Sequence, residues 1–135
     1  MGLVYRVAVF PHHTDYAGVV WHGTYITWLE EARVLWLQQA GINYADLVAA
    51  GVELPVVAMS LKYHRPARMG DHLDIHGRCN RTGVRLIWYY QIYKDSTICV
   101  SGEVTLAPVD MEKGKILRHL PDPLGQAIEQ ILQNS

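Results

Sequence analysis

The feature that most constrains this fold is a predicted helix over residues 24–40 that is apolar on more than one face. Its large apolar residues are Trp28, Leu29, Val34, Leu35, Trp36 and Leu37. Thr24 favours the start, because a threonine hydroxyl can cap free helix amides, and Gly41 follows where glycine commonly ends a helix. A helix that is apolar nearly all round has to be buried on most sides. The rest of the chain must therefore supply the surrounding layer.

After residue 52 the apolar pattern changes from a helical period to a twofold alternation, which is typical of half-buried strands. Strands are predicted at 4–10, 56–64, 72–79, 84–93, 97–109 and 116–117, and further helices at 43–50 and 124–132. The turns Arg81-Thr82-Gly83 and Lys94-Asp95-Ser96 predict successive hairpins, hence an antiparallel meander of about four strands. A lone buried helix beside such a sheet predicts an α+β domain in which one face of the sheet curls around the helix.

Length and composition fit one globular domain over residues 1–135, because half the residues are apolar and 19% are charged. A net charge of −1 gives no electrostatic basis for binding nucleic acid or an anionic membrane. The sequence shows no secretory signal and no apolar run near the ~20 residues of a membrane span, which predicts a cytoplasmic protein. Cys79 and Cys99 lack metal-type spacing and are predicted as core residues in a reducing compartment.

The aromatic content predicts more than one subunit. Four tryptophans and eight tyrosines offer more aromatic surface than one helix could cover. An apolar excess of this kind indicates that another chain covers part of the surface. We therefore expect a homodimer or a homotetramer.

Two motifs resemble those of a known family. They are Thr14-Asp15-x-x-Gly18-Val19-Val20-x-His22-x-x-Tyr25, continued by Leu29-Glu30-x-Ala32-Arg33, and Leu61-x-Tyr63-x-Arg65-Pro66-Ala67-Arg68-x-Gly70-Asp71. Over nearly the whole chain, this order and spacing resemble the hotdog-fold acyl-CoA thioesterases related to 4-hydroxybenzoyl-CoA thioesterase. The resemblance implies a curved antiparallel sheet wrapped around one long central helix, with two protomers forming a continuous sheet and active sites at their interface.

The resemblance also implies hydrolysis of an aryl- or acyl-CoA thioester to the free acid and coenzyme A, with no further cofactor. A 1,4-dihydroxy-2-naphthoyl, 4-hydroxybenzoyl or fatty acyl group is compatible with it. Many relatives carry an aromatic residue four positions before the catalytic acid, whereas this chain has Pro11, so the choice of acyl group stays open. Two other functions also stay open: hydrolysis of an acyl carrier protein thioester, and non-catalytic binding of acyl-CoA.

The resemblance places Asp15 at the position of the family's catalytic acid. Thioester hydrolysis needs a carboxylate that activates water or attacks the carbonyl, and donors aimed at the developing oxyanion. Asp15 precedes a helix start, where free amides and the positive dipole end converge, so the amides of His22 and Gly23 are candidate oxyanion donors. The His22 side chain is a further candidate donor. The competing interpretation of Asp15 is an Asx-turn cap of its own loop.

Substrate contacts are predicted from the second motif and the helix. The basic residues are Lys62, His64, Arg65 and Arg68. Basic side chains can hold the phosphates of coenzyme A, although a solvated strand end would have the same composition. Tyr25 is predicted to line the acyl pocket, and its alternative is an ordinary core position.

Other carboxylates and histidines offer alternative sites. Glu30 and Glu31 lie on the helix where another branch of the fold carries its catalytic carboxylate, and we interpret them as structural because Asp15 fills that role. Two groups have the side-chain types that bind iron or zinc: His12 and His13 with Asp15, and His72 and Asp74 with His76. Strand alternation explains the second group as an ordinary polar face, so no metal site is predicted.

Overall fold

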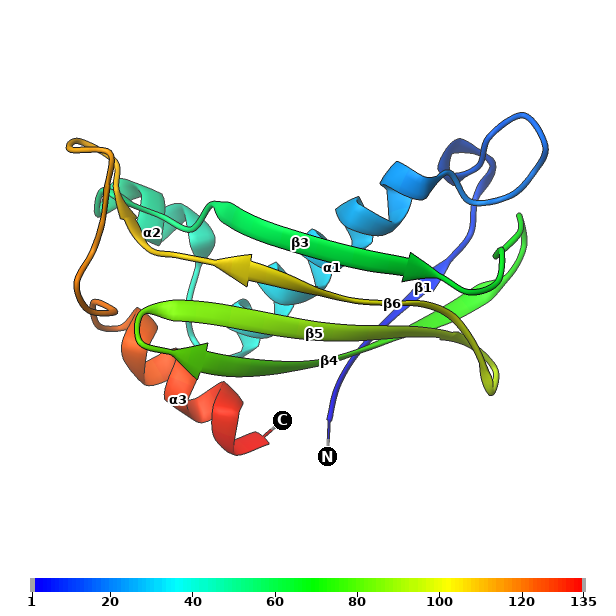
Figure 1. Ribbon diagram of the computed structural model, residues 1–135. Helices are drawn as coiled ribbons and strands as arrows, with labels where there is room; N and C mark the ends of the chain where they lie inside the picture. The colour runs from blue at the N-terminus through cyan, green and yellow to red at the C-terminus, as the bar shows by residue number, and fades with distance from the viewer. Residues whose placement is uncertain (1, 135) are drawn as a thin grey trace.

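The computed structural model describes residues 2–134 and contains a curved antiparallel sheet with one face packed on a long helix (Figure 1). The helix is α1 (His22–Gln39). The main sheet has the order β1-β4-β5-β6-β3, formed by β1 (Leu3–Ala8), β3 (Val56–Tyr63), β4 (His72–Thr82), β5 (Arg85–Lys94) and β6 (Thr97–Leu106). The predicted α+β arrangement of a sheet around one helix is confirmed.

Shorter elements close the ends of this layer. A small second sheet joins β2 (Val52–Glu53), β7 (Val109–Asp110) and β8 (Lys115–Ile116). The remaining helices are η1 (Pro11–His13), α2 (Tyr44–Ala49) and α3 (Leu124–Asn134). α3 packs against β4 and α1 and buries Leu124, Ile128 and Ile131 in the core. No helix within residues 2–134 is long and apolar enough to cross a membrane.

The core lies between α1 and the inner face of the sheet. On α1, the buried residues are Tyr25, Trp28, Leu29, Ala32, Arg33, Trp36 and Leu37. Trp36 stacks on Trp88 and Tyr90 of β5, with ring centroids 5.8 and 6.1 Å apart. Gly77 of β4 gives the Trp36 indole its space, because a Cβ at this position would collide with that ring. Twofold alternation along β4 and β5 therefore produces one face shaped around the helix.

The helix begins two residues before the predicted start. Its N-cap is Trp21, whose side chain makes no capping bond, whereas Thr24 Oγ1 donates to the carbonyl oxygen of His13 at 2.9 Å. The threonine hydroxyl thus ties the first turn to the preceding loop. The predicted end is confirmed, since α1 stops at Gln39 and Gly41 adopts a φ of 94°.

The predicted meander of four strands is wrong for its first member. β4, β5 and β6 are joined by hairpins, but β3 pairs with β6 and β4 pairs with β1. Residues 64–71 therefore run from the free edge of the sheet to the opposite side, over the end where α1 begins (Figure 1). Strand alternation predicts which residues form strands, and it leaves the spatial order of strands undetermined.

Several boundaries also differ from the prediction. β4 extends to Thr82, so its hairpin turn is Gly83-Val84. The predicted strand over 97–109 divides into β6 and β7 at Ala107-Pro108, as the proline requires. The helices predicted at 43–50 and 124–132 are found as α2 and α3, and Asn43 Oδ1 caps α2 by accepting the N–H of Ala45 at 2.9 Å.

One edge of the sheet carries an exposed apolar strip. β3 is the edge strand, and no other strand among residues 2–134 pairs with its free side. Val56, Met59 and Tyr63 are 41%, 39% and 51% exposed, and Ile26 on the neighbouring surface of α1 is 38% exposed. Both β3 and α1 therefore leave large apolar side chains exposed.

Candidate active site

The loop over residues 14–21 is held against residues 66–71, which lie far from it in the sequence. Val20 N–H donates to the carbonyl oxygen of Ala67 at 2.8 Å, and Met69 N–H donates to that of Gly18 at 3.0 Å. Gly18 has a φ of 80°, which a residue with a Cβ rarely adopts. The two sequence motifs thus meet in space, and together they form the end of the molecule at which α1 starts.

Asp15 lies half-buried within this loop. Its Oδ1 accepts the N–H of Ala17 at 2.9 Å and that of Val19 at 3.4 Å. The Asx-turn that the sequence offered as an alternative is therefore present. Among residues 2–134 only Oδ1 carries such hydrogen bonds, so the turn fixes the carboxylate while leaving Oδ2 without one. Asp15 can therefore close the turn through Oδ1 and still take part in chemistry through Oδ2.

The first turn of α1 follows directly. The N–H groups of His22 and Gly23 belong to the opening turn of a helix, where no intrahelical acceptor exists. A Cβ at Gly23 would meet the indole ring of Trp21, which is 53% exposed and would have to move aside. The His22 side chain is exposed, and its ring centroid lies 4.8 Å from that of Trp21.

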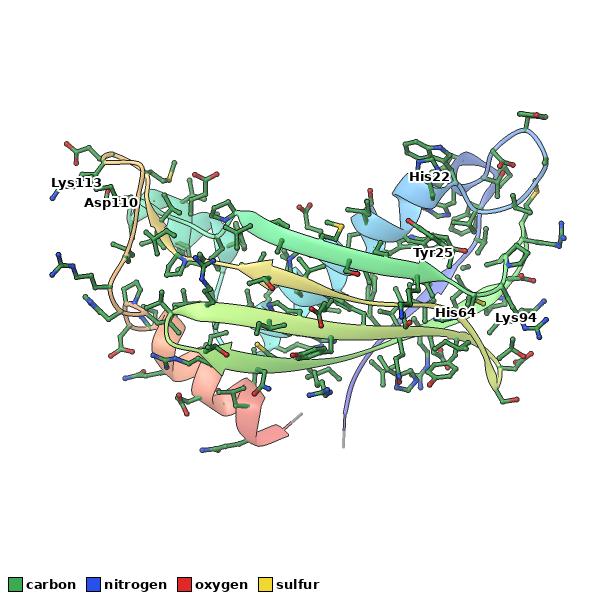
Figure 2. All side chains as sticks on the ribbon, viewed as in Figure 1. His22, Tyr25, His64, Lys94, Asp110 and Lys113 are labelled. Carbon is green, nitrogen blue, oxygen red and sulfur yellow. The ribbon has the colours of Figure 1, made fainter. Side chains whose placement is uncertain are left out.

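A cavity of about 260 Å³ opens beside this turn. Its lining residues are Val20, His22, Tyr25, Tyr63, His64, Arg65 and Pro66. Figure 2 shows His22, Tyr25 and His64 at the same end of the molecule. Tyr63 OH donates to the carbonyl oxygen of His22 at 3.3 Å, and its ring packs 5.7 Å from that of Tyr25. Burial raises the pKa of Tyr25 to about 12, so its hydroxyl is neutral at physiological pH.

The predicted basic residues are shared between two hollows, and His64 lines one of them while its Nε2 lies 2.7 Å from Oγ of Ser101, which lines the other. His64 and Arg65 line the cavity beside His22, whereas Lys62 lines a separate hollow of about 640 Å³. That hollow spans the sheet's outer face, because Lys62 pairs with Ser101 and alternates with the inward-facing Tyr63. Arg68 lies in the crossing segment, and its N–H donates to the carboxylate of Asp71 at 2.8 Å.

The alternative sites are placed apart from this cavity. Glu30 is exposed and lies 4.0 Å from the guanidinium of the buried Arg33, and Glu31 is exposed. Within the described part of the chain, no three His, Cys, Asp or Glu side chains are grouped so as to hold a metal ion. Three cavity-lining residues received no role in the sequence interpretation: Val20, Tyr63 and Pro66. Alternation along β3 places Tyr63 on the inner face.

A family model supplies the deciding comparison. The model described as the thioesterase-like superfamily matches residues 9–128, which include both motifs, α1 and all the cavity-lining residues. The chain belongs to the thioesterase-like superfamily. The predicted resemblance to hotdog thioesterases and the prediction of a thioester hydrolase are both confirmed.

Individual members of this superfamily agree. The chain is 47% identical over 130 residues to the candidate esterase sll0410 of Synechocystis, covering 94% of this chain and 78% of that protein. It is 32% identical over 111 residues to the acyl-CoA thioester hydrolase YbgC of Escherichia coli, covering 81% of this chain and 83% of that protein. Slr0204, a 1,4-dihydroxy-2-naphthoyl-CoA thioesterase from Synechocystis, superimposes with a TM-score of 0.88 at 23% identity, over 97% of this chain and 98% of that one. This last likeness shows the shared hotdog fold.

Proposed function

We propose that this thioesterase hydrolyses an acyl-CoA thioester, with Asp15 as the carboxylate that activates water or attacks the thioester carbonyl. The observation that carries the proposal is the meeting of three features at one end of the molecule: the Asp15 loop, the free amides that begin α1, and the cavity between His22 and His64. The relative named as an acyl-CoA thioester hydrolase supports the choice of substrate class.

The N–H groups of His22 and Gly23 are the proposed oxyanion donors. Backbone donors at a helix start are fixed before the substrate arrives and add the positive end of the helix dipole. The His22 side chain is exposed at the rim and is positioned to orient the thioester. The two hydrogen bonds to Oδ1 of Asp15 hold its carboxylate, which leaves Oδ2 for water or for the substrate carbonyl carbon.

Substrate recognition divides along the cavity. Tyr25 and Tyr63 supply an aromatic wall for the first carbons of the acyl group. Arg65 supplies a cationic group for the phosphates of coenzyme A, and His64, whose Nε2 lies 2.7 Å from Oγ of Ser101, supplies a polar ring beside it. Arg68 extends this basic rim in the same crossing segment. Lys62 faces the other side of the sheet, and the proposal gives it no contact with the acyl group.

We further propose a homodimer that pairs β3 with its copy. A two-fold axis makes such a pair antiparallel, so the end of one β3 lies opposite the start of the other. Tyr63 would then face the region around the partner's Val56. There a cavity of about 520 Å³ lies between α1, α2 and β3; Val34, Val48, Leu54, Pro55, Val56 and Met111 form its apolar part, and Glu30, Arg33, Tyr44 and Glu53 form the rest of its lining. The acyl group would continue along the apolar part of this lining, and the exposed strip on β3 supports the pairing.

We also propose that residues 1–135 form one domain and that the protein is cytoplasmic. One core cluster runs from Val9 to Ile131. Cys79 and Cys99 are both buried and unpaired, which fits a reducing compartment.

The test is coenzyme A release from a panel of aryl-, short-chain and long-chain acyl-CoAs by the wild type and Asp15→Asn. The chain offers a matched control in Asp110, whose Oδ1 accepts the N–H of Glu112 and of Lys113 at the opposite end of the molecule (Figure 2). We expect Asp15→Asn to lose turnover and Asp110→Asn to keep it. If the protein hydrolyses only acyl carrier protein thioesters, the proposed acyl-CoA substrate is wrong and the carrier-protein thioester takes its place. Binding of acyl-CoA without turnover by the wild type would identify a non-catalytic module.

A further inference from the structure

His13 lies at the base of the Asp15 loop and has no role in the proposed chemistry. It ends η1, the short turn that follows β1. The His13 N–H donates to the carbonyl oxygen of Phe10 at 2.9 Å, and the His13 Nδ1 accepts the N–H of Phe10, also at 2.9 Å. These two reciprocal bonds close the turn, and the second depends on the imidazole ring.

The carbonyl oxygen of His13 connects this turn to α1. It accepts the N–H of Trp21 at 3.1 Å and the hydroxyl of Thr24 at 2.9 Å. Trp21 is the N-cap of α1, and Thr24 belongs to its first turn. The loop that carries Asp15 thus leaves from His13 and returns to it, so His13 sets the distance between Asp15 and the amides that begin the helix.

The ring of His13 also packs on the helix. It meets the indole of Trp28 edge-on, with centroids 4.9 Å apart and planes at 65°. Trp28 is 2% exposed and lies in the second turn of α1, so the ring rests against a fixed part of the core. On its other side, the ring of His12 lies 4.0 Å away.

We propose that His13 is a positioning residue, whose neutral imidazole holds Asp15 in register with the N–H groups of His22 and Gly23. The proposal rests on the function assigned above to Asp15. Because Nδ1 accepts a hydrogen bond, the ring proton resides on Nε2, and a doubly protonated ring would lose the acceptor. The hydrogen bond from Phe10 N–H to His13 Nδ1, which we call the anchor, therefore exists only while the imidazole is neutral.

The surroundings of the ring favour this neutral form. Burial, and then the neighbouring His12, lower the pKa of His13. Phe10 and Trp28 face the ring without a titratable group, and His12 is the titratable side chain whose charge acts on it within residues 2–134. The anchor is thus complete above the ordinary imidazole pKa of 6.5 and is lost as the pH falls through the lowered value.

Two variants separate the acceptor from the packing. His13→Asn places a non-titrating oxygen near the position of Nδ1, and His13→Leu fills the space against Trp28 without an acceptor. We expect His13→Leu to lower kcat on the order of 10- to 100-fold with KM within about threefold, because a small displacement of a catalytic group costs about that much. His13→Asn should keep kcat within about threefold and lose the part of the acid-side decline in kcat that protonation of His13 is expected to cause in the wild type.

Wild-type kcat in His13→Leu would overturn the proposal, as would an equal loss of kcat in both variants. Thermal unfolding of each variant checks that the fold is intact. Hydrogen exchange of the peptide over residues 14–22 supplies a readout that needs no activity. Faster exchange in His13→Leu alone supports the anchor even if the wild type hydrolyses no thioester, in which case only the assigned function fails. Unchanged exchange in His13→Leu contradicts the anchor.

Discussion

Replacement of Gly77 by alanine tests the way in which α1 is seated on the sheet. The added Cβ would collide with the ring of Trp36, which is 1% exposed and stacked on Trp88 and Tyr90. Because these rings fill the space on its other side, Trp36 cannot yield without displacing the core. Gly77 has no positive φ, so the backbone itself accepts alanine.

The expected magnitude combines two opposing effects. Overpacking of a filled core costs about 1–3 kcal/mol. Loss of glycine's freedom in the unfolded chain contributes about 0.4–1 kcal/mol in the other direction. The net loss of stability is therefore between about 0 and about 2.6 kcal/mol, with a central value of about 1.3 kcal/mol. For 135 residues the unfolding entropy is about 0.28 kcal/mol/K, so Tm should fall by about 5 °C and by no more than about 9 °C.

The assay is thermal unfolding at fixed protein concentration, carried out as a double-mutant cycle with Trp36→Leu. The smaller leucine removes the collision, so Gly77→Ala should become neutral or stabilising in that background. The coupling between the two positions should then be about 1–3 kcal/mol. If the effects of Gly77→Ala and Trp36→Leu on stability are additive, or if Gly77→Ala alone leaves Tm unchanged, the inference that Gly77 makes room for the Trp36 indole is refuted.

Three further predictions concern the loops and the core. Burial opposes ionisation of Asp71, but hydrogen bonds from a backbone N–H and from Lys94 outweigh it and lower the pKa of Asp71. Asp71→Asn should therefore destabilise the protein by about 1–2 kcal/mol at neutral pH, and the difference in Tm should fade as the pH falls below 3.8; a constant difference would contradict the ion pair. Burial raises the pKa of Cys79 to about 12 and also raises that of Cys99. Iodoacetamide should thus modify neither thiol before unfolding, as mass spectrometry would show. Tyr63→Phe removes one hydroxyl bond to the first residue of α1, so kcat should fall about fivefold, and an unchanged kcat would exclude that bond from the site.

The fold was predictable from the sequence wherever local pattern decides it. The change from a helical to a twofold period after residue 52 identifies the elements, and Gly41 and Asn43 mark where α1 ends and α2 begins. The place of β3 at the free edge depends on long-range pairing with β6, which no local pattern encodes. The start of α1 was missed because the Thr24 hydroxyl bonds to the preceding loop.

The candidate site was predictable in part for the same reason. The two motifs identified the segments that meet, and the structure brings His22, Tyr25, His64 and Arg65 to one cavity. Lys62 was grouped with them because it is adjacent in sequence, yet it lines a separate hollow together with Ser101, to which His64 is hydrogen-bonded. The role proposed for His13 depends on contacts between the turn and the helix, which only the three-dimensional structure supplies.

The measurement that tests the central claim most directly is the kcat of Asp15→Asn on the best CoA ester of the panel, relative to the wild type. Asparagine preserves the oxygen that caps the loop and removes the charge, so the fold and the oligomeric state should be unchanged. The account predicts a loss of about 10²–10⁴-fold, the range for a positioned acid or base. A kcat within a few-fold of the wild type, in a folded variant, would contradict the assignment of Asp15 to the chemistry.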